Sequence, residues 1–208
     1  MLTMSTLKKS LSSKSIYHHG NLVYDLKKYA IKMIRSKGVK QLSLRQLATK
    51  CGVSATAVYR HYESKEHLLA AIALDGFYEL QKAMLESIEP YKLKKIGVAY
   101  INFALQNPVK FQLMFGALLK KENHPTLYEE SQKAYYILRD EVVENIKQGY
   151  MADNIDSLTR TAWATVHGTA MLLLDNQFVI QKNEVIDSNQ IILEITRVLG
   201  QGLFVKTE

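Results

Sequence analysis

The sequence has a single cysteine, Cys51, and lacks an uncharged apolar run long enough to cross a bilayer. One cysteine excludes an intrachain disulfide framework and fits a reducing cytoplasm. Cys51 falls at an expected apolar position of a helix, so we expect it to pack in a core. The longest uncharged hydrophobic stretch, residues 161–174, is shorter than the roughly 20 residues that a membrane span needs, and the first residues lack a signal-peptide pattern. We therefore expect a soluble, cytoplasmic protein with no membrane partner.

Sequence patterns typical of enzymes are missing as well. No serine sits in a nucleophile elbow, and no glycine-rich loop joins a strand to a helix. Outside the first residues, no two histidines have metal-ligand spacing on a shared helix. The six histidines are His18, His19, His61, His67, His124 and His167. The sequence predicts no catalytic residue, no metal, no cofactor and no enzymatic activity.

Basic charge is concentrated in the first third of the chain. Residues 1–66 contain 13 Lys and Arg against 3 Asp and Glu, whereas residues 67–208 contain 14 against 17. The first part is therefore strongly positive and the remainder is close to neutral. Because Lys and Arg replace condensed counterions on DNA, this asymmetry favours a phosphate-binding lobe joined to a second lobe of another role.

The most informative segment, residues 42–72, has the pattern of a helix-turn-helix. Ser43 and Gln46 have capping-box spacing, which starts one short helix with Leu47 and Ala48 facing inward. Gly52 follows at a turn that favours positive φ, and Ser54 is a natural N-cap for the second helix. Small residues at the crossing allow the two helices to approach closely. We expect the second helix to enter the DNA major groove.

Helical periodicity continues along the rest of the chain, without strand alternation or repeats, and predicts an all-α fold of about nine helices. We expect helices at about 21–37, 43–51, 54–61, 64–87, 92–106, 108–119, 126–148, 155–176 and 188–203, with Asp153 or Asp156 as a possible cap of the eighth. The predicted organisation is a flexible basic arm at 1–15, a helix-turn-helix domain at 16–66, and a ligand-binding and dimerisation domain at 67–208.

Residues from about 21 to 72 resemble the DNA-binding domain of the TetR (tetracycline repressor) family of transcriptional regulators. The matching motifs are Leu47-Ala48, Gly52-Val53-Ser54, AVYRHY from Ala57 to Tyr62, and Ser64-Lys65-Glu66 before Leu68-Leu69. Two further segments, YINFALQNPVKFQLMFG at residues 100–116 and WATVHG at residues 163–168, are similar to a TetR subgroup marked by a Trp and a His-Gly pair. The resemblance implies a DNA-binding head of three helices and a helical ligand-binding body.

The DNA contacts expected from this motif fall into two groups. By position, Ala55, Thr56 and Ala57 face base edges after the Ser54 cap, and Arg60 can reach guanine. By resemblance, Arg45 reaches bases or backbone, and Tyr59, His61 and Lys65 contact phosphates. A structural role for His61 is an equal alternative, whereas Tyr62 is expected in the core. The predicted DNA-binding residues are Arg45, Ser54, Ala55, Thr56, Ala57, Tyr59, Arg60, His61 and Lys65.

In the second lobe, aromatic residues with a few polar tips have the composition of a small-molecule site. The candidates are Tyr100, Phe103, Phe111, Met114, Phe115, Tyr135, Trp163 and His167. Trp163 and His167 could equally be structural. The last two helices carry apolar stripes suited to a four-helix bundle between two chains. Those stripes comprise Trp163, Val166, Ala170, Leu173 and Leu174, then Ile191, Ile192, Ile195, Val198, Leu199 and Gly202.

Together these features predict a homodimeric, ligand-responsive regulator of transcription. Its expected partners are a palindromic operator in double-stranded DNA, a second copy of the chain and a small-molecule effector. Repression is the favoured role, with release of the operator when the effector occupies the second lobe. A DNA-architectural or ligand-independent DNA-binding protein is the alternative. The sequence leaves open the effector, the operator and whether the protein represses or activates.

Overall fold

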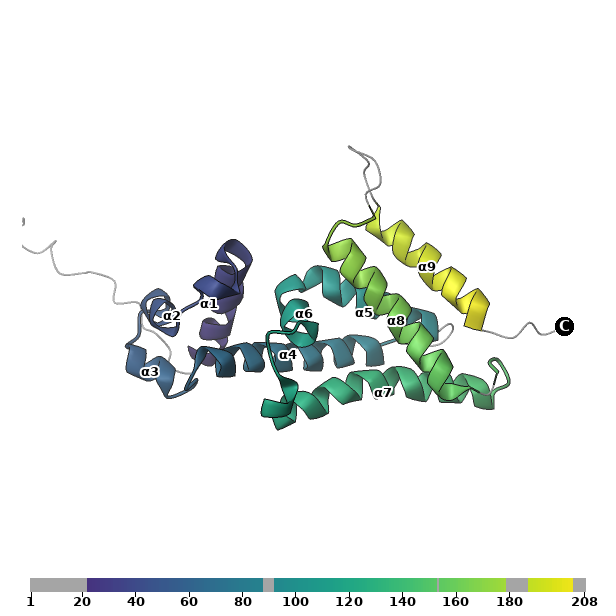
Figure 1. Cartoon of the computed structure of the whole chain (residues 1–208), viewed down its shortest axis with the longest axis horizontal. Helices are drawn as coiled ribbons and strands as arrows, with labels where there is room; N and C mark the ends of the chain where they lie inside the picture. Colours follow the sequence, from purple (N-terminus) through teal and green to yellow (C-terminus); the bar gives the residue numbers. More distant parts are fainter. Residues whose placement is uncertain (1–21, 88–91, 153, 179–186, 204–208) are drawn as a thin grey trace, which may run out of the picture.

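The computed structural model describes residues 22–87, 92–152, 154–178 and 187–203 (Figure 1). Within these ranges the chain folds into nine α-helices and two short 3-10 helices without a β-strand, which confirms the all-α fold. The arm expected at residues 1–15 lies outside the described residues. None of the described helices combines the length and the hydrophobicity that a membrane span requires.

The first three helices and the start of the fourth form a compact head around one apolar centre. They are α1 (Leu22–Lys37), α2 (Leu44–Cys51), α3 (Ala55–Tyr59) and α4 (Lys65–Leu85), with the 3-10 helix η2 (Val39–Gln41) after α1. The inward residues Leu26, Leu47, Val58 and Leu68 are completely buried. Tyr62 is also buried, as expected.

Helix α4 is 21 residues long and runs from the head into the body (Figure 1). Its first turn contributes Leu68 and Leu69 to the core of the head. Farther along, it packs on α5 (Lys92–Gln106), α6 (Pro108–Phe115) and α7 (Pro125–Lys147). The same rigid element therefore belongs to both lobes.

The body is a helical bundle in which α4 and α5 are surrounded by the later helices. The 3-10 helix η3 (Lys121–Asn123) precedes α7, and α8 (Ile155–Leu174) and α9 (Ser188–Leu203) complete the bundle. Helix α8 packs on α5 and α7, and α9 packs mainly on α5 and α8. Helix α9 thus lies at one side of the body (Figure 1).

Helix ends follow local chemistry, with three departures from the sequence prediction. Ser43 occupies the N-cap of α2, but its side chain makes no capping hydrogen bond. Helix α8 is capped by Asn154, whose side chain accepts a hydrogen bond from the Ser157 amide, and not by Asp156. The other predicted cap, Asp153, lies outside the described residues. Helix α6 stops at Phe115 and not at residue 119, because Gly116 has an extended backbone (φ −75°, ψ 163°).

Candidate nucleic-acid interface and ligand-binding region

The crossing of α2 and α3 depends on small residues and one left-handed glycine. Ala48 and Val58 are almost completely buried, and Gly52 has φ 68° and ψ 28° at the turn between the helices. A side chain with a Cβ is strained in this backbone conformation. Cys51 is completely buried, and burial followed by the charge of Asp25 raises the pKa of its thiol. The core position predicted for Cys51 is therefore confirmed.

The predicted DNA-binding residues differ in how far they are exposed. Most of them are exposed, and Ala55, Ala57 and Lys65 are half-buried. The exposed ones are Arg45, Ser54, Thr56, Tyr59, Arg60 and His61. Tyr59 exposes 44% of its surface although it is aromatic. Because Val58 anchors α3 from the inside, Thr56, Tyr59 and Arg60 are presented outward on a short fixed helix.

Ser54 and Lys65 already have partners within the head. The Ser54 hydroxyl accepts a hydrogen bond from the Ala57 amide at 3.2 Å, as expected for an N-cap. The ammonium of Lys65 donates to the carbonyl of Lys40 at 3.3 Å. No local pattern predicts this second contact, because the two residues are 25 positions apart. Lys65 therefore holds η2 against the start of α4.

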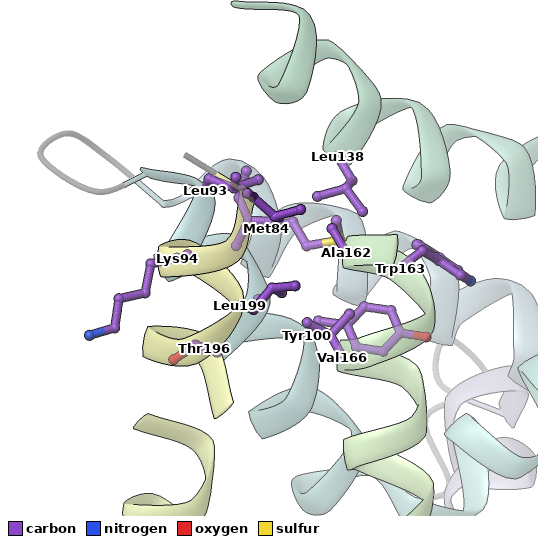
Figure 2. Close-up of a pocket in the computed structure, with 14 residues that line it drawn as sticks. Met84, Leu93, Lys94, Tyr100, Leu138, Ala162, Trp163, Val166, Thr196 and Leu199 are labelled. Carbon is purple, nitrogen blue, oxygen red and sulfur yellow. The ribbon is translucent and has the colours of Figure 1, made fainter. Parts of the chain in front are cut away.

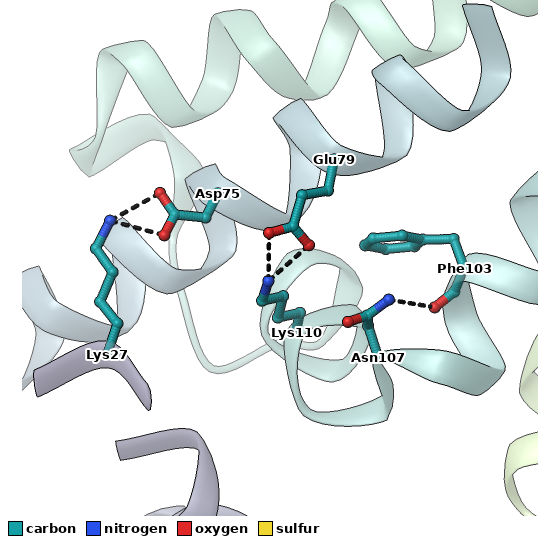
Figure 3. Close-up of polar contacts among 6 residues, drawn as sticks. All are labelled: Lys27, Asp75, Glu79, Phe103, Asn107 and Lys110. Carbon is teal, nitrogen blue, oxygen red and sulfur yellow. Dashed lines mark hydrogen bonds and ion pairs between the residues drawn. The ribbon is translucent and has the colours of Figure 1, made fainter. Parts of the chain in front are cut away.

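Two ion pairs on one stretch of α4 join the head to the body (Figure 3). Lys27 on α1 donates to both carboxylate oxygens of Asp75 at 2.7 Å. Lys110 on α6 donates to both carboxylate oxygens of Glu79 at 2.6 Å. Gly76 lies between the two acids, and a Cβ built there would stand 2.5 Å from the Met114 sulfur on α6. Helices α4 and α6 are thus in direct contact where α4 also holds α1.

Six of the eight predicted ligand-site residues form one aromatic cluster in the body. Tyr100 packs against Trp163, with ring centroids 5.2 Å apart, and its hydroxyl lies 2.8 Å from Nδ1 of His167. Burial raises the pKa of Tyr100, which keeps the phenol protonated. The His167 ring stacks on Phe111 and contacts Phe115 edge-on, and Tyr135 packs against Trp163. The rings contact one another, so their mutual packing occupies this part of the body.

A cavity of about 40 Å³ lies beside this cluster, between α5, α8 and α9 (Figure 2). Of the predicted residues, only Tyr100 and Trp163 line it. Phe103 and Met114, the two predicted residues outside the cluster, are buried in the core and do not line the cavity. The full lining is Met84, Leu93, Lys94, Ile96, Gly97, Tyr100, Leu138, Ala162, Trp163, Val166, Thr196, Leu199, Gly200 and Leu203.

The apolar stripes of α8 and α9 divide between the core and the surface. Val166, Ala170, Leu173 and Ile192 are buried within the chain, so they form intrachain core. An outward apolar face remains on both helices. Its exposed or half-exposed members are Ala164, Gly168, Met171 and Leu172 on α8, and Ile191, Ile195, Val198 and Gly202 on α9.

A helix-turn-helix head joined through α4 to a helical body defines a DNA-binding regulator with an all-α second lobe. Residues 28–72 match the family model "Bacterial regulatory proteins, tetR family", and residues 93–194 match "Tetracyclin repressor-like, C-terminal domain". Together the two models span well over half of the chain, which therefore belongs to the TetR family of transcriptional regulators.

Individual relatives agree with this assignment. The chain is 25% identical over 154 residues to the "Uncharacterized HTH-type transcriptional regulator YobS" of Bacillus subtilis (strain 168), covering 72% of this chain and 77% of that protein. A solved "protein with unknown function" from Rhodococcus sp. RHA1 has a TM-score of 0.79 and 26% identity, covering 91% of this chain and 99% of the other. The TetR family regulator PfmR of Thermus thermophilus has a TM-score of 0.67 and 18% identity, covering 85% and 97%, and so shares the fold.

Proposed function

We propose that this TetR family regulator is a homodimeric repressor that binds a palindromic operator and releases it when a small molecule occupies the body. The observation that carries this proposal is the stretch of α4 that pairs with α1 through Asp75 and with α6 through Glu79. A displacement of α6 acts on α4 through Lys110 and Met114, and α4 carries the head.

For DNA, the proposal assigns base contacts to Thr56 and Arg60 and phosphate contacts to Arg45, Tyr59 and His61. The exposure of these side chains supports this assignment. Ala55 and Ala57 are half-buried, so only their methyl groups are available for contact with DNA, and only at close approach. Ser54 and Lys65 have structural hydrogen bonds, so any DNA contact by either would be made alongside a structural role.

For dimerisation, the outward apolar face of α8 and α9 is the proposed contact surface. A Cβ built at Gly168 or Gly202 meets no atom within 4 Å, so the chain itself does not fill the space beside these glycines. A symmetric pair of chains would place the two α3 helices in half-sites roughly one turn, about 34 Å, apart.

Ligand-independent DNA binding is the second candidate function, and the small cavity favours it. Ligand pockets usually enclose about 300–1,000 Å³, whereas this cavity measures about 40 Å³. In that case the body serves dimerisation alone. The effector model instead requires the body to open when the ligand enters, with coupling of about 1–3 kcal/mol between ligand and DNA.

The test begins with selection of DNA from a random duplex library at near-physiological salt. We expect an inverted repeat, and recovery of bulk duplex only would refute the palindromic operator. On the selected site, Arg60→Ala should cost about 1–3 kcal/mol and relax preference at one position. Arg45→Ala, at a proposed phosphate contact, should weaken binding to all sequences alike and lower the salt slope by about 1. Lys147→Ala, in the last turn of α7, is the matched control and should change neither.

Repression and release need separate assays. A reporter with the selected site across its promoter should be silenced by the protein, and stimulated expression would identify an activator. Sedimentation of the wild type should give a dimer, which Val198→Asp on the outward face of α9 should dissociate. A wild-type monomer, or a Val198→Asp dimer of unchanged affinity, would contradict the proposed contact surface.

A further inference from the structure

The cavity between α5, α8 and α9 has walls that are almost entirely hydrocarbon. Its lining includes Met84 from α4, Ile96 from α5, Leu138 from α7, Val166 from α8 and Leu199 from α9. These side chains offer no hydrogen-bonding group. A polar ligand group placed among them would lose its hydration without compensation.

The few polar side chains in the lining have their polar atoms engaged or turned away. The Tyr100 hydroxyl bonds to His167 at 2.8 Å, and the Thr196 hydroxyl donates to the Ile192 carbonyl at 2.7 Å. In Figure 2 the Tyr100 hydroxyl and the Trp163 indole nitrogen lie on the side of their rings away from Met84 and Leu93. The interior therefore selects an apolar group over one that needs a hydrogen bond.

One cation stands at the edge of this apolar space. Lys94, in the first turn of α5, contributes to the lining, and its ammonium extends away from the cavity (Figure 2). Such a side chain covers apolar surface with its methylene stem while its charge stays in water. The nearby Lys92 is already bound to Glu141 at 2.6 Å. Lys94 is thus the lining residue that can receive an anionic head group.

We propose that this cavity binds an alkyl carboxylate, with the chain among the apolar walls and the carboxylate at Lys94. The proposal rests on the effector role given above and names the chemical class of the effector. It places the ligand beside the aromatic cluster that six of the predicted ligand-site residues form, with Tyr100 and Trp163 as the shared wall.

Helix α9 is the wall that must yield to a chain of more than a few carbons. It contributes Thr196, Leu199, Gly200 and Leu203 to the lining and packs mainly on α5 and α8. A Cβ built at Gly200 meets no atom within 4 Å, so this wall is loosely filled. Since α9 also carries half of the outward apolar face, a bound chain would alter the proposed dimer contact.

The test uses Trp163, the one tryptophan of the sequence, as a reporter in the full-length protein. Hexanoate, octanoate and decanoate are titrated below their micelle concentrations while tryptophan fluorescence is followed, and heats are measured in parallel. Burial of each added methylene should tighten binding by about fourfold for as long as α9 yields to the lengthening chain. 1-Decanol, with the same chain and no charge, should bind more weakly than decanoate.

Matched variants separate the head group from the chain. Lys94→Gln should weaken the binding of decanoate by roughly 2- to 5-fold, the effect of losing an exposed ion pair. It should leave the affinity for decanol unchanged. Lys95→Gln, an exposed neighbour outside the lining, should change neither. Ala162→Leu and Gly200→Leu should weaken the binding of both ligands, because the larger side chains fill the cavity. Thermal melting establishes that each variant is folded.

Three outcomes would overturn the proposal. They are no binding of decanoate to the wild type, unchanged affinity in both folded cavity-filling variants, and equal loss of decanoate binding in Lys94→Gln and Lys95→Gln. These titrations contain no DNA. Decanoate that binds as expected but leaves operator affinity unchanged would refute effector release and support the binding site.

Discussion

The contact between α4 and α6 at Gly76 gives a quantitative test of how the body holds the head. A Cβ added at Gly76 would lie 2.5 Å from the Met114 sulfur, 3.1 Å from Met114 Cγ and 3.3 Å from Lys110 Cβ. Met114 is completely buried, so its side chain can make room only by displacing other core side chains. Gly76→Ala should therefore strain the packing between α4 and α6.

Two effects of opposite sign set the size of this change. Overpacking of a filled core costs about 1–3 kcal/mol, and replacing glycine by alanine within a helix gains about 1 kcal/mol. The net expectation is a loss of about 0–2 kcal/mol of unfolding free energy. In a Met114→Ala background the obstructing side chain is gone, so the same substitution should gain about 1 kcal/mol.

The assay is urea unfolding of the wild type, both single variants and the double variant at one fixed protein concentration. The expected coupling between the two sites is about 1–3 kcal/mol, within the range seen for residues in contact. Gly200→Ala on α9 is the control, because a Cβ built there meets no atom within 4 Å. This substitution should show only the stabilisation of about 1 kcal/mol that alanine brings to a helix in place of glycine. A gain of about 1 kcal/mol from Gly76→Ala in both backgrounds would refute the close contact.

Two further predictions concern the head. Burial, followed by the charge of Asp75, raises the pKa of Tyr62 to about 12; the phenol ionises near 10 when unfolded, so Tyr62 stabilises the fold below pH 10. Between these two pKa values the unfolding free energy should fall by about 1.4 kcal/mol per pH unit. In Tyr62→Phe, the plot of unfolding free energy against pH should be shallower over this range. An unchanged slope would contradict this prediction. Ser64→Ala removes the hydrogen bond that the Ser64 hydroxyl accepts from the His67 amide, and it should lower the unfolding free energy measured in urea by about 1 kcal/mol. The control Ser43→Ala removes no capping hydrogen bond and should cost clearly less. Equal losses would show that the Ser64 bond contributes nothing.

Features set by neighbouring residues could be predicted from the sequence. The Ser54 and Ser64 caps each join a hydroxyl to an amide three positions ahead, and Gly52 adopts its left-handed conformation within a single turn. Contacts between distant residues could not. Lys27 and Asp75 are 48 positions apart, and Glu79 and Lys110 are 31 apart. Helical periodicity indicates which face is apolar, but not which charged residues meet at its edge.

The ligand region shows why composition pointed to the aromatic residues as a small-molecule site and missed most of the residues that line the adjoining cavity. Aromatic rings with polar tips stand out in a sequence, and Tyr100, Trp163 and His167 do converge. The cavity walls are mostly aliphatic residues at ordinary core spacing, so their composition is that of any helical core. The small residues Ala162 and Gly200 line this space between three helices, and a Cβ built at Gly200 meets no atom within 4 Å. Empty volume depends on how the helices are placed relative to one another, and only the three-dimensional packing contains that information.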